Sequence, residues 1–380
     1  METTFPFGLE FPLAFYLTVY VVTLVAHVVL MSYVLAGSLW LTWASLFPGP
    51  GQMPRSMQPV ARLLRDWMPF ALSGAITAGV APLLFVQILY QQQFYTANLL
   101  LGWRWMVVIP VLITVFYLLY VVKSRAITAW SLALRVLLAC GVAACFLFVA
   151  FCWTANHLLS LDAQHWPSAF VSDTAVTSVW TLSLRLATWV CGTLPVMSLL
   201  AAWQLRGMCS RTAKWTGEES AGGVSSIDWN SQFAQENRRL MHLSIAGTMI
   251  ALVFAIAYFL QLAPHVREPL KGRTGFAWLI VLAVSSAAMI LIAWIRSRKP
   301  VQELRLLTGF TGVQAVQLIA ASSLREIVRL AQTDLKTVTR SASEAFQIGG
   351  LSVFLIFAVM NLGLIAFCIV LVKRRPQNPG

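Results

Sequence analysis

The sequence predicts an all-α integral membrane protein, a single helical bundle that crosses a lipid bilayer about nine times. Of its 380 residues, 58% are hydrophobic and only 11% are charged. Soluble domains carry about 25% charged residues, so a water-soluble fold of this length could not bury so much apolar surface. The apolar residues also form runs long enough to span a hydrocarbon core of about 30 Å, which takes about 20 helical residues.

Eight of these runs are clear spans. In chain order they cover residues 11–47, 67–94, 105–122, 126–153, 179–204, 240–262, 276–295 and 349–372. The first run is long enough to tilt or to project from the bilayer. The second contains Gly74, Gly79 and Pro82, which favour a kink or close helix packing.

A further segment, residues 306–324, is more polar than the others. It carries Gln314, Gln317 and several small residues, but no charged side chain. Small residues let helix backbones approach closely in lipid. We therefore predict a ninth span that neighbouring helices shield from lipid, and we treat residues 1–380 as one polytopic transmembrane domain.

The basic residues predict how the spans are oriented, because Lys and Arg concentrate in cytoplasmic loops. With nine spans and the N-terminus outside, 17 of the 27 Lys and Arg residues fall on the cytoplasmic side and eight on the outer side. With eight spans, the cluster Lys373, Arg374 and Arg375 would lie outside. We therefore expect an outside N-terminus and a cytoplasmic C-terminus. This topology and contact with anionic lipid explain the net charge of +13, without nucleic-acid binding.

Two polar segments are predicted to lie outside the bilayer. Residues 207–237 are rich in serine, glycine and charge, and we expect a mobile cytoplasmic loop there. Residues 325–346 are amphipathic, and we expect a helical extension on the outer side.

Ionisable side chains deep in a bilayer are costly and mark candidate functional positions. His27 lies near the middle of the first span. Its neutral imidazole is a candidate metal ligand, to the iron of a b-type haem, through one ring nitrogen. A hydrogen bond to a neighbouring helix is the alternative role. His242, at the cytoplasmic start of the sixth span, is a candidate second residue at the cofactor if the first helix is tilted.

Arg135 and Arg185 lie within the fourth and fifth predicted spans. Their guanidinium groups either extend to lipid headgroups or contact a haem propionate, a quinone carbonyl or an anionic solute. No Asp or Glu falls inside any predicted span, which disfavours a proton pump or a cation-coupled transporter. The sequence contains no catalytic motif that assigns a reaction.

Two stretches carry a resemblance to a known family. FYLTVYVVTLVAHVVLMSYVLAGSLWL (residues 15–41) and ALSGAITAGVAPLLFVQILYQQQFYTANLLLGWRW (residues 71–105) resemble uncharacterised bacterial polytopic membrane proteins that accompany c-type cytochromes. SLREIVRLAQ (residues 323–332) fits the same family. These proteins are distantly similar to subunit I of the cytochrome bd quinol oxidases, which has nine spans, an outside N-terminus and a haem-ligating histidine in its first helix. The resemblance implies that role for His27.

The sequence also departs from the oxidase pattern. The third span has no glutamate, the fifth has no histidine, residues 263–275 are too short for a quinol-binding loop, and no GRxPW motif occurs. The resemblance therefore implies one haem b at most and no oxygen-reducing site. No CxxCH motif for covalent c-type haem is present either.

Two hypotheses follow. The first is a membrane subunit of a respiratory or electron-transfer system in the bacterial cytoplasmic (inner) membrane. It would bind haem b, work with a cytochrome c or another respiratory subunit, and exchange electrons with quinone. The second is a cofactor-free membrane transporter or scaffold subunit.

Overall fold

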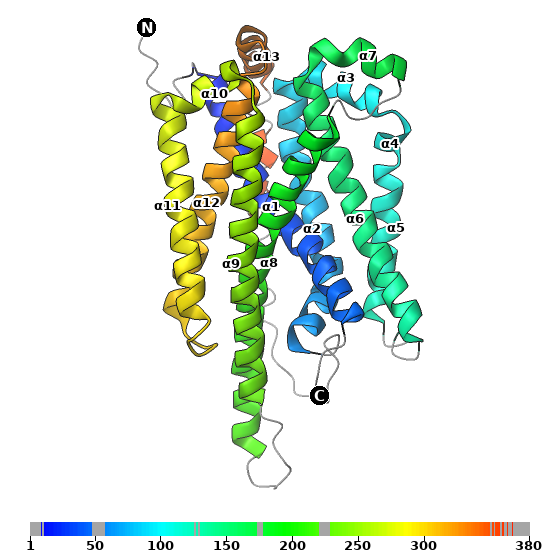
Figure 1. The fold of residues 1–380 in the computed structure, drawn as a ribbon, viewed down its shortest axis with the longest axis vertical. Coiled ribbons are helices and arrows are strands. Elements are labelled where there is room, and N and C mark those ends of the chain that lie inside the picture. Colours follow the sequence, from blue (N-terminus) through cyan, green and yellow to red (C-terminus); the bar gives the residue numbers. More distant parts are fainter. Residues whose placement is uncertain are drawn as a thin grey trace.

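A computed structural model describes most of the chain as helix (Figure 1). It describes residues 9, 11–47, 58–124, 127, 130–172, 178–219 and 229–349, and scattered positions between 352 and 367. Within these residues there is no β-strand, so the predicted all-α fold class is confirmed.

Eight helical segments in the described part are long and apolar enough to cross a membrane. The third of them joins the short α4 (Trp103–Met106) to α5. The long helices are α1 (Leu13–Leu46), α2 (Pro59–Leu89), α5 (Val108–Lys123), α6 (Leu132–Leu161), α8 (Val179–Glu219), α9 (Trp229–Gln261), α11 (Arg273–Arg296) and α12 (Leu304–Leu330). The polar segment 306–324 lies within α12, one of these long helices. The predicted span 349–372 falls largely outside the described residues.

The short helices gather at one end of the bundle, the top in Figure 1, which we call the upper end. They are α3 (Gln91–Leu101), α4, η4 (Ala163–His165), α7 (Trp166–Ser172), α10 (Pro264–Lys271) and α13 (Leu335–Gln347). The opposite, lower end contains the turn between α11 and α12 and the long extensions of α8 and α9. Helix α1 begins at the upper end and runs downward, and the following long helices alternate in direction.

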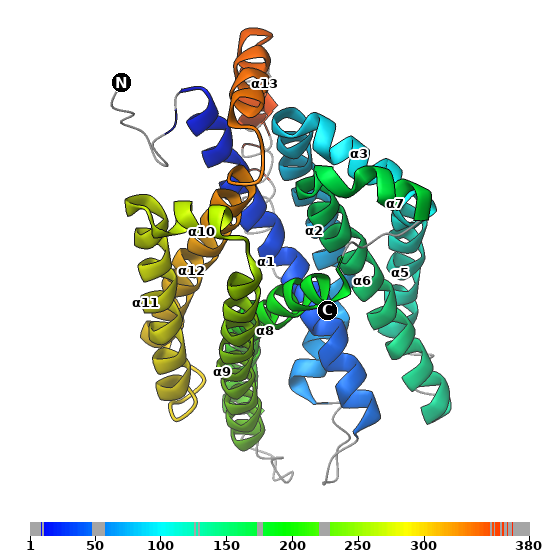
Figure 2. The ribbon, with the colours of Figure 1, turned by 45° about the horizontal axis from the view of Figure 1, so that its top comes forward.

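Antiparallel pairs build the bundle. The most extensive contacts join α8 with α9, α1 with α2, and α11 with α12. Helix α1 is central, because it also packs on α6, α8 and α12. Figure 2 shows α1 between the α8–α9 and α11–α12 pairs on one side and α2, α5 and α6 on the other.

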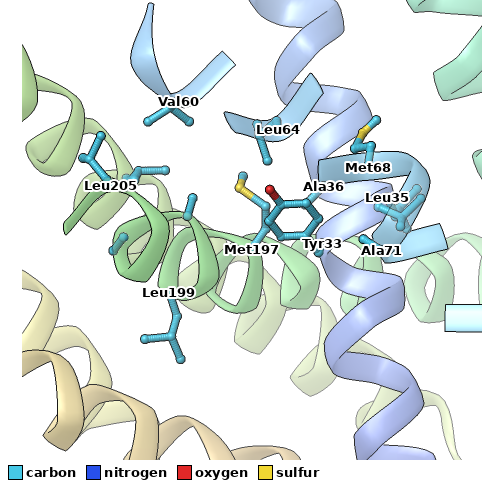
Figure 3. Close-up of a cluster of buried hydrophobic side chains, with 14 of the residues drawn as sticks. Tyr33, Leu35, Ala36, Val60, Leu64, Met68, Ala71, Met197, Leu199 and Leu205 are labelled. Atoms are coloured by element: carbon cyan, nitrogen blue, oxygen red, sulfur yellow. The ribbon is translucent and has the colours of Figure 1, made fainter. Parts of the chain in front are cut away.

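Apolar side chains fill the contact between α1, α2 and α8 (Figure 3). Tyr33 of α1, Leu64 and Met68 of α2, and Met197 of α8 are all 3% exposed or less. Large apolar side chains such as Leu137 of α6 also cover the outer surfaces of the helices. A helix satisfies its backbone hydrogen bonds internally, and a helix whose outer surface is also apolar is stable in contact with lipid. The chain is therefore a multi-pass membrane protein in contact with the bilayer.

Glycines bring α1 and α2 together at the positions where the sequence predicted close packing. A Cβ on Gly74 would lie 3.1 Å from Leu30 of α1, and one on Gly79 would lie 2.9 Å from the ring of His27. Both glycines therefore let a larger side chain of α1 approach the α2 backbone, as small residues do at membrane helix contacts.

Most of the predicted cytoplasmic loop over residues 207–237 is helical. Helix α8 continues to Glu219 and α9 begins at Trp229, so both extend beyond their apolar parts. Polarity alone does not end a helix. The helix-breaking composition is confined to the Ser- and Gly-rich stretch at 220–226, which lies outside the described residues. The predicted polar extension over residues 325–346 comprises the last six residues of α12, a short turn, and nearly all of helix α13.

Candidate functional site

The imidazole of His27 is held against the backbone of α2. Its Nδ1 lies 2.9 Å from the carbonyl oxygen of Ala75. A carbonyl oxygen only accepts hydrogen bonds, so the Nδ1 carries the proton and donates it. The other ring nitrogen, Nε2, then keeps its lone pair. Metal-binding histidines commonly show this arrangement, in which a backbone carbonyl fixes the tautomer of the ring.

The donor chemistry at His27 therefore fits a metal ligand. Two cavities of the described part, one between α1, α2, α5 and α6 and one between α11 and α12, are not lined by His27. No group of three or more metal-ligating side chains occurs among the described residues either. The residues at this position therefore fit one axial ligand, the Nε2 of His27.

The structure does not place His242 at His27. His242 lies on α9 with its side chain exposed, and no hydrogen bond joins it to His27 in the described part of the chain. The tilt of the first helix does not bring the two imidazoles together, since His27 faces α2.

Ionisable side chains from six elements meet at the upper end of the bundle, two turns above His27. Arg325 of α12 donates to the hydroxyl of Tyr20 at 2.6 Å and to the carboxylate of Glu326 at 2.7 Å. The hydroxyl of Tyr90 donates to the same carboxylate at 3.1 Å. The guanidinium of Arg329 stacks over the ring of Tyr90 at 3.7 Å.

The second half of this group comes from α6, α8 and α9. Arg185, predicted as a site residue, donates to the Nε2 of His157 at 2.7 Å and lies over the ring of Tyr258 at 5.1 Å. The two halves lie within electrostatic range of each other. We call the whole set the upper arginine cluster. It comprises Tyr20, Tyr90, His157, Arg185, Tyr258, Arg325, Glu326 and Arg329.

Two donors in the upper arginine cluster have no acceptor. Because Arg185 can only donate, the Nε2 of His157 accepts and the proton of His157 is on Nδ1. That Nδ1 and the Nε of Arg329 are both buried without a hydrogen-bond partner among the described residues. The residues themselves are 6% and 2% exposed. A buried donor without an acceptor costs about 1–3 kcal/mol, so such groups call for an explanation.

The charges of the cluster do not balance either. Three arginines face one carboxylate, that of Glu326, and the remaining members are neutral. The net charge of the described cluster is therefore +2. Arg329 is buried, whereas Arg185 and Arg325 are partly exposed, so the uncompensated charge is most unfavourable at Arg329. A ligand with two negative charges would balance the cluster, and its oxygens would accept from the two free donors.

Sequence reasoning missed most of this cluster. It assigned Arg325, Glu326 and Arg329 to a polar outer segment and His157 to the interface. The predicted span at 306–324 is part of a longer helix, because α12 continues to Leu330 and contains the buried Glu326. The signal in the sequence was the REIVR spacing, which places Arg325 and Arg329 on one face of a helix, four residues apart.

The structure places Arg135 at the other end of the bundle. Its side chain lines a cavity at the lower end together with Arg65, between α1, α2, α5 and α6. Arg135 and Arg185 therefore belong to two separate sites, and neither contacts His27 in the described part of the structure.

Comparisons with protein-family models, with curated proteins and with solved structures find no match to this chain. The upper arginine cluster and the fixed imidazole of His27 are the two features of this chain that point to a ligand.

Proposed function

We propose that this protein is a membrane subunit of an electron-transfer system that holds one b-type haem, with His27 as an axial ligand. The observation that carries the proposal is the hydrogen bond from His27 Nδ1 to the carbonyl oxygen of Ala75. It leaves Nε2 as an iron ligand inside an apolar bundle. When bound, a b-type haem passes single electrons by cycling between the ferric and ferrous states.

The upper arginine cluster supports the same ligand. A haem carries two propionate groups, and their two negative charges would balance the net +2 of the cluster. Tyr20, a member of the cluster, and His27 are seven residues apart, so they lie on the same face of α1 about 10 Å apart along its axis. His27 bonds to α2, whereas the hydroxyl of Tyr20 accepts from Arg325 of α12. Arg185, Arg325 and Arg329 would hold the acidic end of the ligand.

The proposal includes a location and partners. Under the predicted topology, with the N-terminus outside, the upper end faces the outer side of a bacterial cytoplasmic membrane. A haem near that side would exchange electrons with a cytochrome c or another respiratory subunit docked there, and with quinone from the bilayer. A partner on the outer side would meet the short helices α3, α7, α10 and α13.

A cofactor-free transporter or scaffold is the second candidate, and one observation favours it. Neither of the two cavities described for the structure is lined by His27. In this alternative the upper arginine cluster would bind an anionic solute directly, and His27 would serve only to join α1 to α2.

Visible spectroscopy distinguishes the two candidates. The protein is purified in mild detergent, and its reduced-minus-oxidised spectrum and haem content are measured for the wild type, His27→Ala and His242→Ala. The electron-transfer proposal expects b-type Soret and α-bands in the wild type and in His242→Ala, whose exposed side chain is the matched control. It expects those bands to be lost in His27→Ala. A colourless wild type, or bands that persist in His27→Ala, would contradict the proposal.

A further inference from the structure

The lower end of the bundle contains a cavity that the proposed function does not use. It lies between α1, α2, α5 and α6 and has a volume of about 70 Å³. Its polar lining comes from Arg65 of α2, Arg135 of α6, and Ser38 and Ser45 of α1. The cavity is at the opposite end of the molecule from the upper arginine cluster, so a ligand there would be a second ligand.

The electrostatics of this cavity favour an anion. Two guanidinium groups line it, and no carboxylate is among its described lining residues. The Nε of Arg135 is buried without a hydrogen-bond partner among the residues that the structure describes. The hydroxyls of Ser38 and Ser45 already donate to the carbonyl oxygens of their own helix, at 2.7 and 2.8 Å. The donors left for a ligand are therefore those of the two arginines, which an oxyanion matches.

The N-terminus of α6 adds to the positive potential that the two arginines create in the cavity. Ser131 caps the helix by accepting from the backbone N–H of Leu134 at 3.4 Å. Leu132 and Arg135, in the first turn of α6, both line the cavity. The N-terminus of a helix carries a partial positive charge that stabilises a nearby anion. Of the acidic side chains on the surrounding elements, Asp66 is next to Arg65 but is exposed and does not line the cavity.

The rest of the lining is apolar. Leu41, Met68, Leu119 and Val142 form the walls, and Leu132, which is 53% exposed, lies where the cavity meets the outer surface of the bundle. All of these residues belong to, or lie next to, membrane-spanning helices. A ligand that matches both the arginines and the apolar walls has an anionic group of phosphate size. It also has an apolar portion that continues from the cavity onto the lipid-facing surface.

From these features we infer that this cavity binds the phosphate group of an anionic phospholipid from the leaflet at the lower end. Basic pockets between membrane helices recognise lipid headgroups in this way. Arg65 and Arg135 hold the phosphate, and the acyl chains lie along the exposed apolar surface of α6. The inference is independent of the haem proposal, because the two sites share no residue.

The test measures thermal unfolding of the purified, full-length protein with phosphatidylglycerol, phosphatidylcholine or inorganic phosphate added in detergent. The variants are Arg65→Gln, Arg135→Gln and the control Arg62→Gln, an exposed arginine one turn from Arg65. We expect phosphatidylglycerol to raise the melting temperature of the wild type by several degrees more than phosphatidylcholine does. Each cavity variant should weaken the apparent lipid affinity about five- to tenfold, whereas Arg62→Gln should leave it within about twofold.

Three outcomes would overturn the inference. An equal effect of phosphatidylglycerol and phosphatidylcholine on the wild type would show that the lipid's charge is not recognised. An effect of inorganic phosphate as large as that of phosphatidylglycerol would point to a soluble phosphate ligand instead. An equal loss of affinity in Arg62→Gln would show that the general surface charge is responsible. If a cavity variant does not fold, the comparison of phosphatidylglycerol with phosphatidylcholine on the wild type still tests the inference. Ala139→Leu, whose larger apolar side chain would fill the cavity, then replaces that variant.

Discussion

The Nδ1 of His27 lies 2.9 Å from the carbonyl oxygen of Ala75, on the helix that runs antiparallel to its own. One turn further along α2, Gly79 leaves the space that the imidazole needs to reach this oxygen. The pair joins the two central helices and determines which ring nitrogen remains free.

Replacing Gly79 with Ala should displace the His27 ring. The new Cβ would lie 2.9 Å from Nδ1, which is too close for van der Waals contact, and the hydrogen bond would be strained or lost. We expect a net loss of stability of about 1–3 kcal/mol, measured by thermal unfolding in detergent. The same substitution at Gly141, where a Cβ would meet nothing within 4 Å, is the control. There the gain in helix propensity should leave stability unchanged or raise it by up to about 1 kcal/mol. A similar response of both variants would contradict the prediction.

Neutralising Glu326 should strongly destabilise the protein. In Glu326→Gln the upper arginine cluster loses its one described carboxylate, which bonds to Arg325 and Tyr90. Removing one partner of a buried ion pair costs about 3–5 kcal/mol, because the other charge is left uncompensated. Glu344→Gln breaks an exposed pair with Arg340 and should cost at most about 0.5 kcal/mol. Folded yield and melting temperature measure both effects, and equal losses would argue against a buried cluster.

Removing one positive charge from the upper arginine cluster should raise the stability of the protein, whereas neutralising Glu326 lowers it. In Arg329→Met a buried cation with an unpaired Nε is replaced by an apolar side chain of similar length. We expect the ligand-free protein to gain about 1 kcal/mol of stability, after subtraction of the lost stacking on Tyr90. If the arginines hold an acidic cofactor, the haem content of this variant should fall at the same time. A variant that loses stability and keeps its haem would show that Arg329 is purely structural.

The start of α13 should become less stable in acid. Asp334 caps this helix by accepting from the Thr337 hydroxyl at 2.6 Å and from the backbone N–H of Lys336 at 3.2 Å. These hydrogen bonds hold the pKa of the Asp334 carboxyl below its ordinary value. Because the pKa is lower in the folded state, the stabilisation is complete above the ordinary aspartate pKa and is lost as the pH falls through the folded value.

Hydrogen-exchange protection of residues 335–338, corrected for intrinsic rates, measures this effect. Protection should be constant near neutral pH and should decrease below the ordinary aspartate range. In Asp334→Asn, which can cap the helix without titrating, the protection should not depend on pH over that range. The same pH dependence in wild type and variant would rule out Asp334 as the titrating group.

The membrane-spanning helices could be predicted because hydrophobic length is a local property. Each apolar run satisfies its own backbone hydrogen bonds once it is helical, so lipid selects it regardless of its neighbours. Even the polar run at 306–324 was identified, since it lacks charge. The positions of the helix ends were not predictable in the same way. Helices α8 and α9 continue past their apolar parts.

The upper arginine cluster could not be predicted from the same pattern. Tyr20, His157, Arg185 and Glu326 are far apart in the chain, and nothing in their local sequence indicates that they meet. They are brought together because α1, α6, α8 and α12 bring their upper ends to one place. Conversely, the sequence placed His27 and His242 as potential partners, and packing separates them, because α1 presents His27 to α2.

The sequence by itself determined that lipid is the solvent of this chain and where its apolar helices lie, because these properties depend only on runs of neighbouring residues. The tertiary structure decided which ionisable side chains share a buried site, which ring nitrogen of His27 is free, and that Arg135 and Arg185 belong to opposite ends of the bundle. Those facts depend on how distant helices pack, and the burial energy of a charge is set by the partners that packing provides.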